Sequence, residues 1–168
     1  IIHQELNLLP ERTIAQNIYL GHEPMRKGLK GVVDYKKMVR DSRALMESLG
    51  LDMNPNTLVK KLSIAQMQMV EVVKALSKEV KLVIMDEPTS SLTSREITKL
   101  FEIVERLKKQ GVAIIYISHR MDEIKRIGDH VTVMRDGQYI DNLNVADVEL
   151  ATLISMMVGC RNKKRYER

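Results

Sequence analysis

The chain has 168 residues, of which 44% are hydrophobic and 29% charged, and this composition predicts a globular domain with a core. Its longest aliphatic runs, such as 112–117, are far shorter than the roughly 20 apolar residues of a membrane span, and no signal peptide is visible, so we expect a soluble, cytosolic chain. The lone Cys160 excludes an intrachain disulfide and a cysteine-cluster metal site.

The charge distribution argues against a nucleic-acid partner. The tail 161–168 holds five basic residues and one acidic residue, a net +4, so that only +1 of the total +5 belongs to the other 160 residues. A basic tail of this kind is usually solvated. The chain also begins with Ile-Ile-His-Gln rather than Met, and we expect a fragment of a longer protein.

The first half of the chain is predicted to be mostly helical. Two helices begin with a capping box, in which a Ser or Thr is followed three residues later by Gln: Thr13 with Gln16, and Ser63 with Gln66. The predicted segments are a short helix after Thr13 that ends before Gly21, a loop at 21–31, a helix at 34–49 that stops at Gly50, and a helix at 63–76.

The second half changes character. A short apolar run at 82–85 ends in two acidic residues, a helix capped by Thr93 and Glu96 follows, and a second apolar run occupies 112–117. Two such runs joined by a helix predict a βαβ unit in a parallel sheet. Beyond it the sequence predicts a helix near 120–127, a hairpin around Asp136-Gly137, and a last helix that carries Leu150, Leu153, Ile154 and Met157 and ends at Gly159.

Three positions carry candidate chemistry. Asp86 and Glu87 follow the first apolar run, at the strand end where open α/β sheets bind ligands, so one carboxylate can hold Mg²⁺ while the other polarises a water. His119 follows the next run and is expected at the same sheet edge, where it can hydrogen-bond a phosphate. Taken singly, an acidic strand end is common by chance, and such a histidine is more often an ordinary surface residue.

In combination, "LSIAQ", "LVIMDEPTSSLT" and "YISHR" appear in an order and spacing that resembles the nucleotide-binding cassette of ABC ATPases. The resemblance implies ATP and Mg²⁺ as cofactors and assigns a role to each matched position. These are Gln4 (Q-loop, touching nucleotide and metal), Ser63, Ile64, Ala65 and Gln66 (signature, binding nucleotide), Asp86 (Walker B, metal), Glu87 (catalytic glutamate), Ser91 within the D-loop at 90–93 (nucleotide), and His119 (catalytic switch histidine).

The sequence departs from that family pattern in three places. Ile64 and Ala65 replace the usual pair of glycines, and backbone contacts to nucleotide survive there only with negative φ values. Thr93 stands where the D-loop usually has Asp, and no GxxxxGK[ST] loop occurs in the chain. The family carries that loop upstream of the Q-loop, so we expect these 168 residues alone to bind ATP poorly and to hydrolyse none.

The resemblance implies an α/β fold: part of a P-loop NTPase domain, with a parallel-sheet core and a helical subdomain. Its expected parts are the Q-loop region (1–9), the helical subdomain with the signature (10–77), the catalytic α/β core (78–135), a hairpin and helix (136–159), and a basic tail that starts a linker (160–168).

Finer stretches, including "LSIAQMQMVEVVKALS", "YISHRMDEI" and "MMVG", resemble the sugar importers whose ATPase subunit fuses two cassettes, most of all the galactose/methyl-galactoside branch, with ribose, xylose and arabinose importers close. This implies as partners the permease's transmembrane subunits, a second cassette and, indirectly, a periplasmic sugar-binding protein, at the cytoplasmic face of the plasma membrane. Two alternatives are a soluble ABC ATPase that acts on ribosomes or DNA, and a cassette that is itself catalytically silent.

Overall fold

The computed structural model describes residues 2, 6–29, 31–78 and 80–159, and the chain divides into two compact units, Ile1–Ile117 and Ser118–Arg168. The boundary expected at 135/136 falls inside a hairpin of the second unit, whereas the division between units follows Ile117. The other expected boundaries remain predictions.

The first unit contains α1 (Ile14–Ile18), α2 (Tyr35–Ser48), the 3-10 turn η1 (Val59–Lys61), α3 (Ile64–Leu76), β1 (Leu82–Asp86), α4 (Ser94–Lys109) and β2 (Ala113–Ile117). The second contains α5 (Met121–Ile127), β3 (His130–Arg135), β4 (Gln138–Asn144) and α6 (Leu150–Val158). Among the described residues, no helix has the length and apolar character needed to cross a bilayer.

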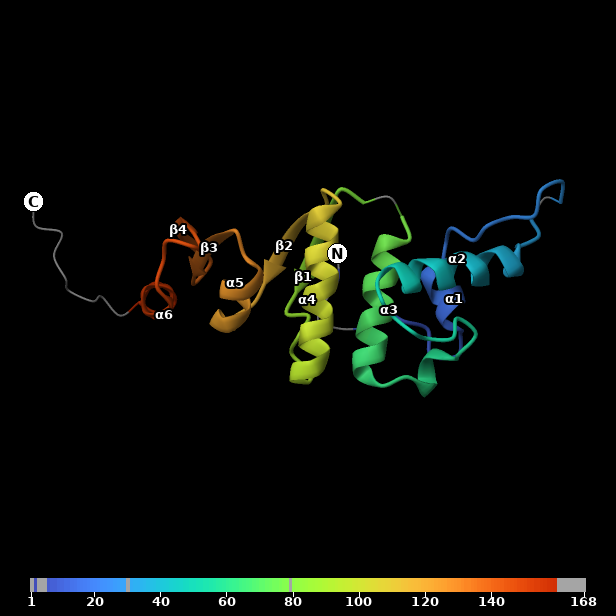
Figure 1. Ribbon diagram of the computed structural model, residues 1–168, viewed down its shortest axis with the longest axis horizontal. Helices are drawn as coiled ribbons and strands as arrows, with labels where there is room; N and C mark the ends of the chain where they lie inside the picture. The colour runs from blue at the N-terminus through green and yellow to red at the C-terminus, as the bar shows by residue number, and fades with distance from the viewer. Residues whose placement is uncertain (1, 3–5, 30, 79, 160–168) are drawn as a thin grey trace, which may run out of the picture. The chain divides into compact units, whose positions relative to one another are not determined.

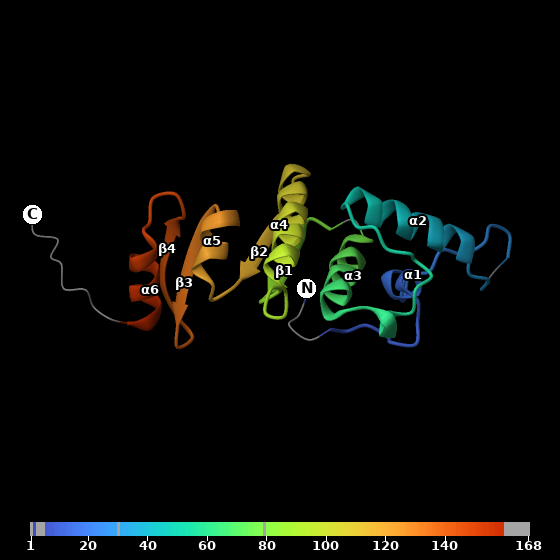
Figure 2. The same cartoon turned by 60° about the horizontal axis from the view of Figure 1, so that its bottom comes forward.

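In the helical part of the first unit, α1 packs against both α2 and α3 (Figure 2). Ile14 and Ile18 of α1 are fully buried in this layer, which explains why a helix of only five residues is stable there. On α2 the buried row is Met38, Ser42 and Met46, spaced four residues apart, whereas the neighbouring Leu45 is only half-buried.

The predicted βαβ unit is confirmed. Strands β1 and β2 pair in parallel, from Leu82 opposite Ala113 to Asp86 opposite Ile117, and α4 lies along them (Figure 1). The apolar face of α4 is buried, with Leu100 and Ile103 completely enclosed. Ile2 extends the sheet on the other side of β1, because its N–H donates to the Ile84 carbonyl at 2.8 Å. Strand β1 is therefore held from both sides, which fixes the position of its carboxyl end.

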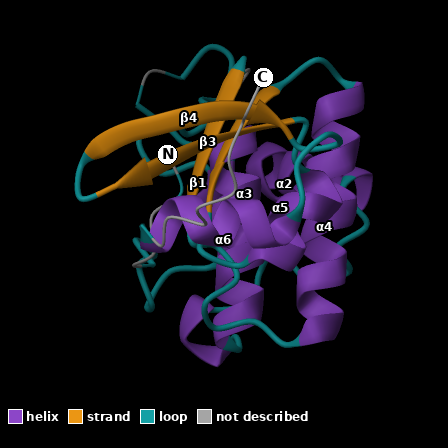
Figure 3. Ribbon diagram, turned by 90° about the vertical axis from the view of Figure 1, so that its left-hand side faces the viewer, coloured by secondary structure: helices purple, strands orange, loops and turns teal. Residues whose placement is uncertain are grey.

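In the second unit, β3 and β4 form the predicted antiparallel hairpin (Figure 3). Its two-residue turn has positive φ at both Asp136 (51°) and Gly137 (74°), as tight hairpin turns require. The core of the unit forms where Val133, Val148 and Leu153 pack together with neighbouring methionines. Of the apolar positions expected to face the core from the last helix only Leu153 is buried, while Ile154 is 48% exposed.

Candidate functional site

Asp86 and Glu87 lie together at the carboxyl end of β1, as the sequence predicts. Both side chains are half-buried, and Asp86 stands opposite Ile117, the last residue of β2. The N–H of Asp86 donates to the carbonyl of Ile2 at 3.0 Å, so the residue is part of the sheet rather than of a loose loop. Its carboxylate is thus presented at a fixed edge of the parallel strands, where such sheets bind ligands.

Glu87 has an unusual backbone conformation. Its φ is +43°, and it is one of two residues other than glycine with positive φ in the described part of the chain. Its N–H donates to the Ile117 carbonyl at 3.0 Å, and its own carbonyl accepts from Ser90 N–H at 3.3 Å. A non-glycine residue in this region is strained, and such strain concentrates at functional sites. The bend turns the chain out of β1 immediately after the two carboxylates.

The segment after Glu87 forms a short, ordered connection to α4. Thr89 is 2% exposed, and the Leu92 N–H donates to the Thr89 carbonyl at 3.1 Å, while Ser91 itself is exposed. The predicted cap of α4 is present: the N–H and the hydroxyl of Thr93 both donate to the Glu96 carboxylate at 2.8 Å. The hydrogen bond from the backbone N–H has the larger effect on the Glu96 carboxylate, and the one from the hydroxyl adds to it. Together they hold the pKa of Glu96 below its usual value.

The signature segment forms the N-terminus of α3, with both hydrogen bonds of the predicted capping box. The Gln66 N–H donates to Ser63 Oγ at 3.2 Å, and the Ser63 N–H donates to Gln66 Oε1 at 2.9 Å. Ile64 and Ala65 lie in the helix and have negative φ. They therefore meet the condition under which residues other than glycine keep the backbone contacts to nucleotide. The Ile64 side chain is 57% exposed, and Ala65 is buried.

The N–H groups of Ile64 and Ala65 have no hydrogen-bond partner within the described part of the chain. They are the first donors of a 13-residue helix, and the helix dipole adds partial positive charge at this end. Together with the Ser63 hydroxyl, they form a surface suited to an anion.

The second unit begins with the residues around His119. His119 is exposed, and its neighbours Ser118 and Arg120 are both tied to Glu123. Ser118 Oγ donates to Glu123 Oε2 at 3.0 Å, Arg120 Nε lies 3.0 Å from Glu123 Oε1, and the Arg120 N–H donates to Ser118 Oγ at 3.0 Å. Glu123 is only 1% exposed, so a buried carboxylate fixes the loop that carries the histidine.

Glu123 is not among the site residues predicted from the sequence. The signal available was the pair of Arg120 and Glu123, whose separation of three residues lets oppositely charged side chains meet. The burial of the carboxylate could not be anticipated, because burial depends on how separate segments pack and not on the local spacing of charges.

The structure brings some of the predicted site residues together, whereas the positions of others relative to the site remain predictions. Asp86, Glu87 and the end of β2 meet at one sheet edge, and Ser63–Gln66 form one helix terminus. His119 belongs to the second unit, so its approach to Glu87 stays a prediction. Gln4 lies outside the described residues.

A divalent cation fits the carboxylates that are present, although three or more acidic, His or Cys side chains do not gather anywhere in the described residues. Mg²⁺ is typically bound through one or two carboxylates together with waters and substrate phosphates. The Asp86 carboxylate, half-buried at the sheet edge, is of the kind that could hold such an ion.

Comparison with known proteins gives consistent matches. A family model described as ABC transporter matches residues 1–90. Over 161 residues the chain is 51% identical to the galactose/methyl galactoside import ATP-binding protein of Clostridium tetani, covering 95% of this chain and 32% of that protein. It is 45% identical over 166 residues to the ribose import ATP-binding protein of Geobacillus kaustophilus, covering 99% of this chain and 33% of that protein. The chain therefore spans about a third of the length of the curated relatives that it matches.

Solved structures agree on the fold. The crystal structure of a nucleotide-free ATP-binding cassette from an ABC transporter superposes with a TM-score of 0.71 at 28% identity, covering 85% of this chain and 59% of that one. A second ATP-binding cassette, solved from a twinned crystal, gives a TM-score of 0.73 at 25% identity, covering 92% of this chain and 66% of the other.

Proposed function

This chain belongs to the ABC transporter family, and we propose that it is part of a cassette that binds and hydrolyses ATP to drive sugar import. The single observation that carries the proposal is the end of β1, where Asp86 and a strained Glu87 are fixed beside Ile117 of the parallel neighbour. An acidic pair held at this edge is suited to a nucleotide's metal and to an attacking water.

Asp86 is the residue that would hold Mg²⁺, with Gln4 as a second oxygen ligand. When bound, the ion would supply charge neutralisation for phosphoryl transfer. Glu87, which directly follows the last residue of β1, accepts a hydrogen bond from the attacking water and orients it. His119, on the loop fixed by Glu123, donates to the γ-phosphate.

The signature terminus serves a different nucleotide. Ser63 Oγ and the N–H groups of Ile64 and Ala65 bind the γ-phosphate of an ATP that is held by a second cassette, with Gln66 keeping the cap in place. Ser91 of the connection after Glu87 is exposed and contacts nucleotide across the same interface. In this arrangement the capping serine stabilises the helix in the empty state and binds phosphate in the closed state.

Galactose or methyl galactoside is the proposed substrate, because relatives that carry that name are 46% to 51% identical to this chain, whereas the ribose import relative is 45% identical. The proposed partners are permease transmembrane subunits and, through them, a periplasmic sugar-binding protein. The protein would then work at the cytoplasmic face of the plasma membrane as a peripheral subunit.

The test uses the full-length protein that contains this sequence, assayed for Mg-ATP binding and ATP hydrolysis beside the 168-residue chain alone. We expect only the full-length protein to bind and hydrolyse ATP, because this chain has no phosphate-binding glycine loop. Tight ATP binding by the 168 residues would contradict this assignment. Uptake of labelled galactose, methyl galactoside and ribose by cells with and without the gene then identifies the sugar.

A further inference from the structure

The excess basic charge outside the tail is concentrated in one segment of the first unit. Residues 26–43 contain seven Lys or Arg and two Asp, a net +5, and removing this from the +1 of residues 1–160 leaves −4 for the rest of them. The small net charge outside the tail is therefore the sum of a strongly basic segment and an acidic remainder. A whole-chain count hides this asymmetry.

The basic segment begins in a compact hairpin loop that exposes apolar side chains. The loop is closed by hydrogen bonds from Arg26 N–H to the Val32 carbonyl at 2.8 Å and from Asp34 N–H to the Pro24 carbonyl at 2.7 Å. Apolar side chains on it are markedly exposed: Met25 52%, Leu29 53%, Val32 41% and Val33 38%. Arg26 and Lys27 are exposed beside them.

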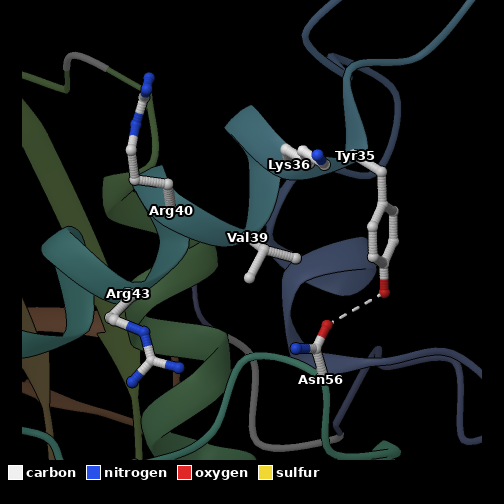
Figure 4. A pocket seen from close by; sticks show the side chains of 6 residues that line it. All are labelled: Tyr35, Lys36, Val39, Arg40, Arg43 and Asn56. Atoms are coloured by element: carbon white, nitrogen blue, oxygen red, sulfur yellow. Dashed lines mark hydrogen bonds between the residues drawn. The ribbon is translucent and has the colours of Figure 1, made fainter.

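The loop leads directly into α2, which continues the basic surface. Lys36, Arg40 and Arg43 line a shallow hollow with Tyr35, Val39 and Asn56, and they extend from successive turns of the helix (Figure 4). Spacings of four and three residues place them on one exposed side of α2, away from the buried row at Met38 and Met46. The Tyr35 hydroxyl donates to Asn56 Oδ1 at 3.2 Å, which fixes one wall of the hollow.

Local acidic groups neutralise only part of this surface. Asp41 forms ion pairs with both Lys37 and Arg40. The hydrogen bond from Lys37 has the largest effect, and both pairs lower the pKa of the Asp41 carboxyl. Lys36 and Arg43 have no ion-pair partner in the part of the chain that the structure describes. Two cations at the hollow are therefore available to an outside anion.

We propose that the described residues of the hairpin loop, 24–29 and 31–34, and the basic side of α2 form a docking surface for an anionic phospholipid membrane. Exposed aliphatic side chains beside several Lys and Arg are the combination that binds the interface of such a membrane, since the apolar groups enter the headgroup region while the cations pair with phosphates. A nucleic-acid site would need the cations without the exposed aliphatic loop. The surface is separate from Asp86, Glu87 and the signature residues, so it does not depend on the assignment of ATP hydrolysis.

The test is sedimentation of the full-length protein with vesicles of phosphatidylcholine alone and of phosphatidylcholine with about one third phosphatidylglycerol. We expect binding only to the anionic vesicles. The double variant Lys36→Glu/Arg43→Glu should lower the partition coefficient at least about tenfold, and Leu29→Asp should lower it as well. The matched control, Lys99→Glu/Lys109→Glu, changes two exposed lysines of α4 and should bind like the parent.

Several outcomes would overturn the proposal. They are no binding to anionic vesicles, equal losses in the patch and α4 variants, or binding that disappears only when the basic tail 161–168 is neutralised. If duplex DNA binds more tightly than the vesicles and depends on the same residues, the surface is a nucleic-acid site instead. Circular dichroism of each variant shows that a loss of binding is not a loss of fold.

Discussion

The backbone N–H of Glu87 donates a 3.0 Å hydrogen bond to the carbonyl of Ile117, which joins the residue after one strand to the last residue of its parallel neighbour. This bond fixes the positive φ of Glu87 at +43° and hence the direction in which the chain leaves β1. Glu87 and Ile117, which are 30 residues apart along the sequence, thereby share one geometry at the ends of two strands.

Glu87→Gln in the full-length protein should leave Mg-ATP binding intact and lower the hydrolysis rate by about 100-fold or more. The amide keeps the size of the side chain but is a poor acceptor for the proton of the attacking water. The measurements are equilibrium nucleotide binding and phosphate release, with Glu102→Gln on the exposed side of α4 as the matched control. Normal turnover in Glu87→Gln would remove Glu87 from its proposed role.

Glu87→Asn should raise the free energy of unfolding by up to about 1 kcal/mol while abolishing hydrolysis. Asn adopts left-handed backbone conformations at lower cost than Glu, so the variant relieves strain at φ +43°. Chemical denaturation with Glu102→Asn as the control measures the effect, since that change in a helix should be destabilising. A loss of stability at position 87 would mean that strain there is negligible.

Ser63→Ala should destabilise the start of α3 by about 1 kcal/mol, because the N–H of Gln66 loses the Ser63 Oγ acceptor. Hydrogen exchange of amides in the first turn of α3 is the readout, and Ser63→Thr, which retains a hydroxyl, should exchange like the parent. If exchange in the first turn is unchanged by alanine, the capping bond contributes nothing measurable.

The Glu96 cap should make stability depend on pH. Hydrogen bonds from Thr93 hold the pKa of Glu96 below its usual 4.5, so the stabilisation is fully present above that value and is lost as the pH falls through the lower pKa of the folded state. Glu96→Gln should therefore flatten the decline in stability at acidic pH, as measured by denaturation at a series of pH values. An unchanged profile would argue against a folded-state role for this carboxylate.

Glu123→Ala should cost about 1–3 kcal/mol, because Ser118 Oγ and Arg120 lose their buried acceptor. Glu123→Gln should cost less, since its amide oxygen can still accept from Ser118. Chemical denaturation gives the stabilities, and an NMR titration of the His119 ring reports whether the loop has moved. Identical spectra and stabilities for Glu123→Ala and the parent would show that the carboxylate does not fix the loop.

Features set by neighbouring residues could be predicted from the sequence. All three predicted capping boxes formed, because a cap joins groups only three residues apart. The hairpin at Asp136-Gly137 formed for the same reason, since its turn needs two residues that tolerate positive φ. The order of motifs was enough to identify the family before any geometry was considered, and the matched residues 1–90 agree.

The features that only the tertiary structure determines depend on groups that are far apart in the sequence. Met46 rather than Leu45 is buried on α2, and the Glu123 carboxylate is buried, and both outcomes depend on tertiary packing rather than on a local pattern. The strained φ of Glu87 requires the carbonyl of Ile117, which a local pattern does not contain. Local hydrogen bonding and hydrophobic periodicity are properties of a short window of sequence, whereas burial, strain and the meeting of charges on a surface arise only when separate segments are packed together.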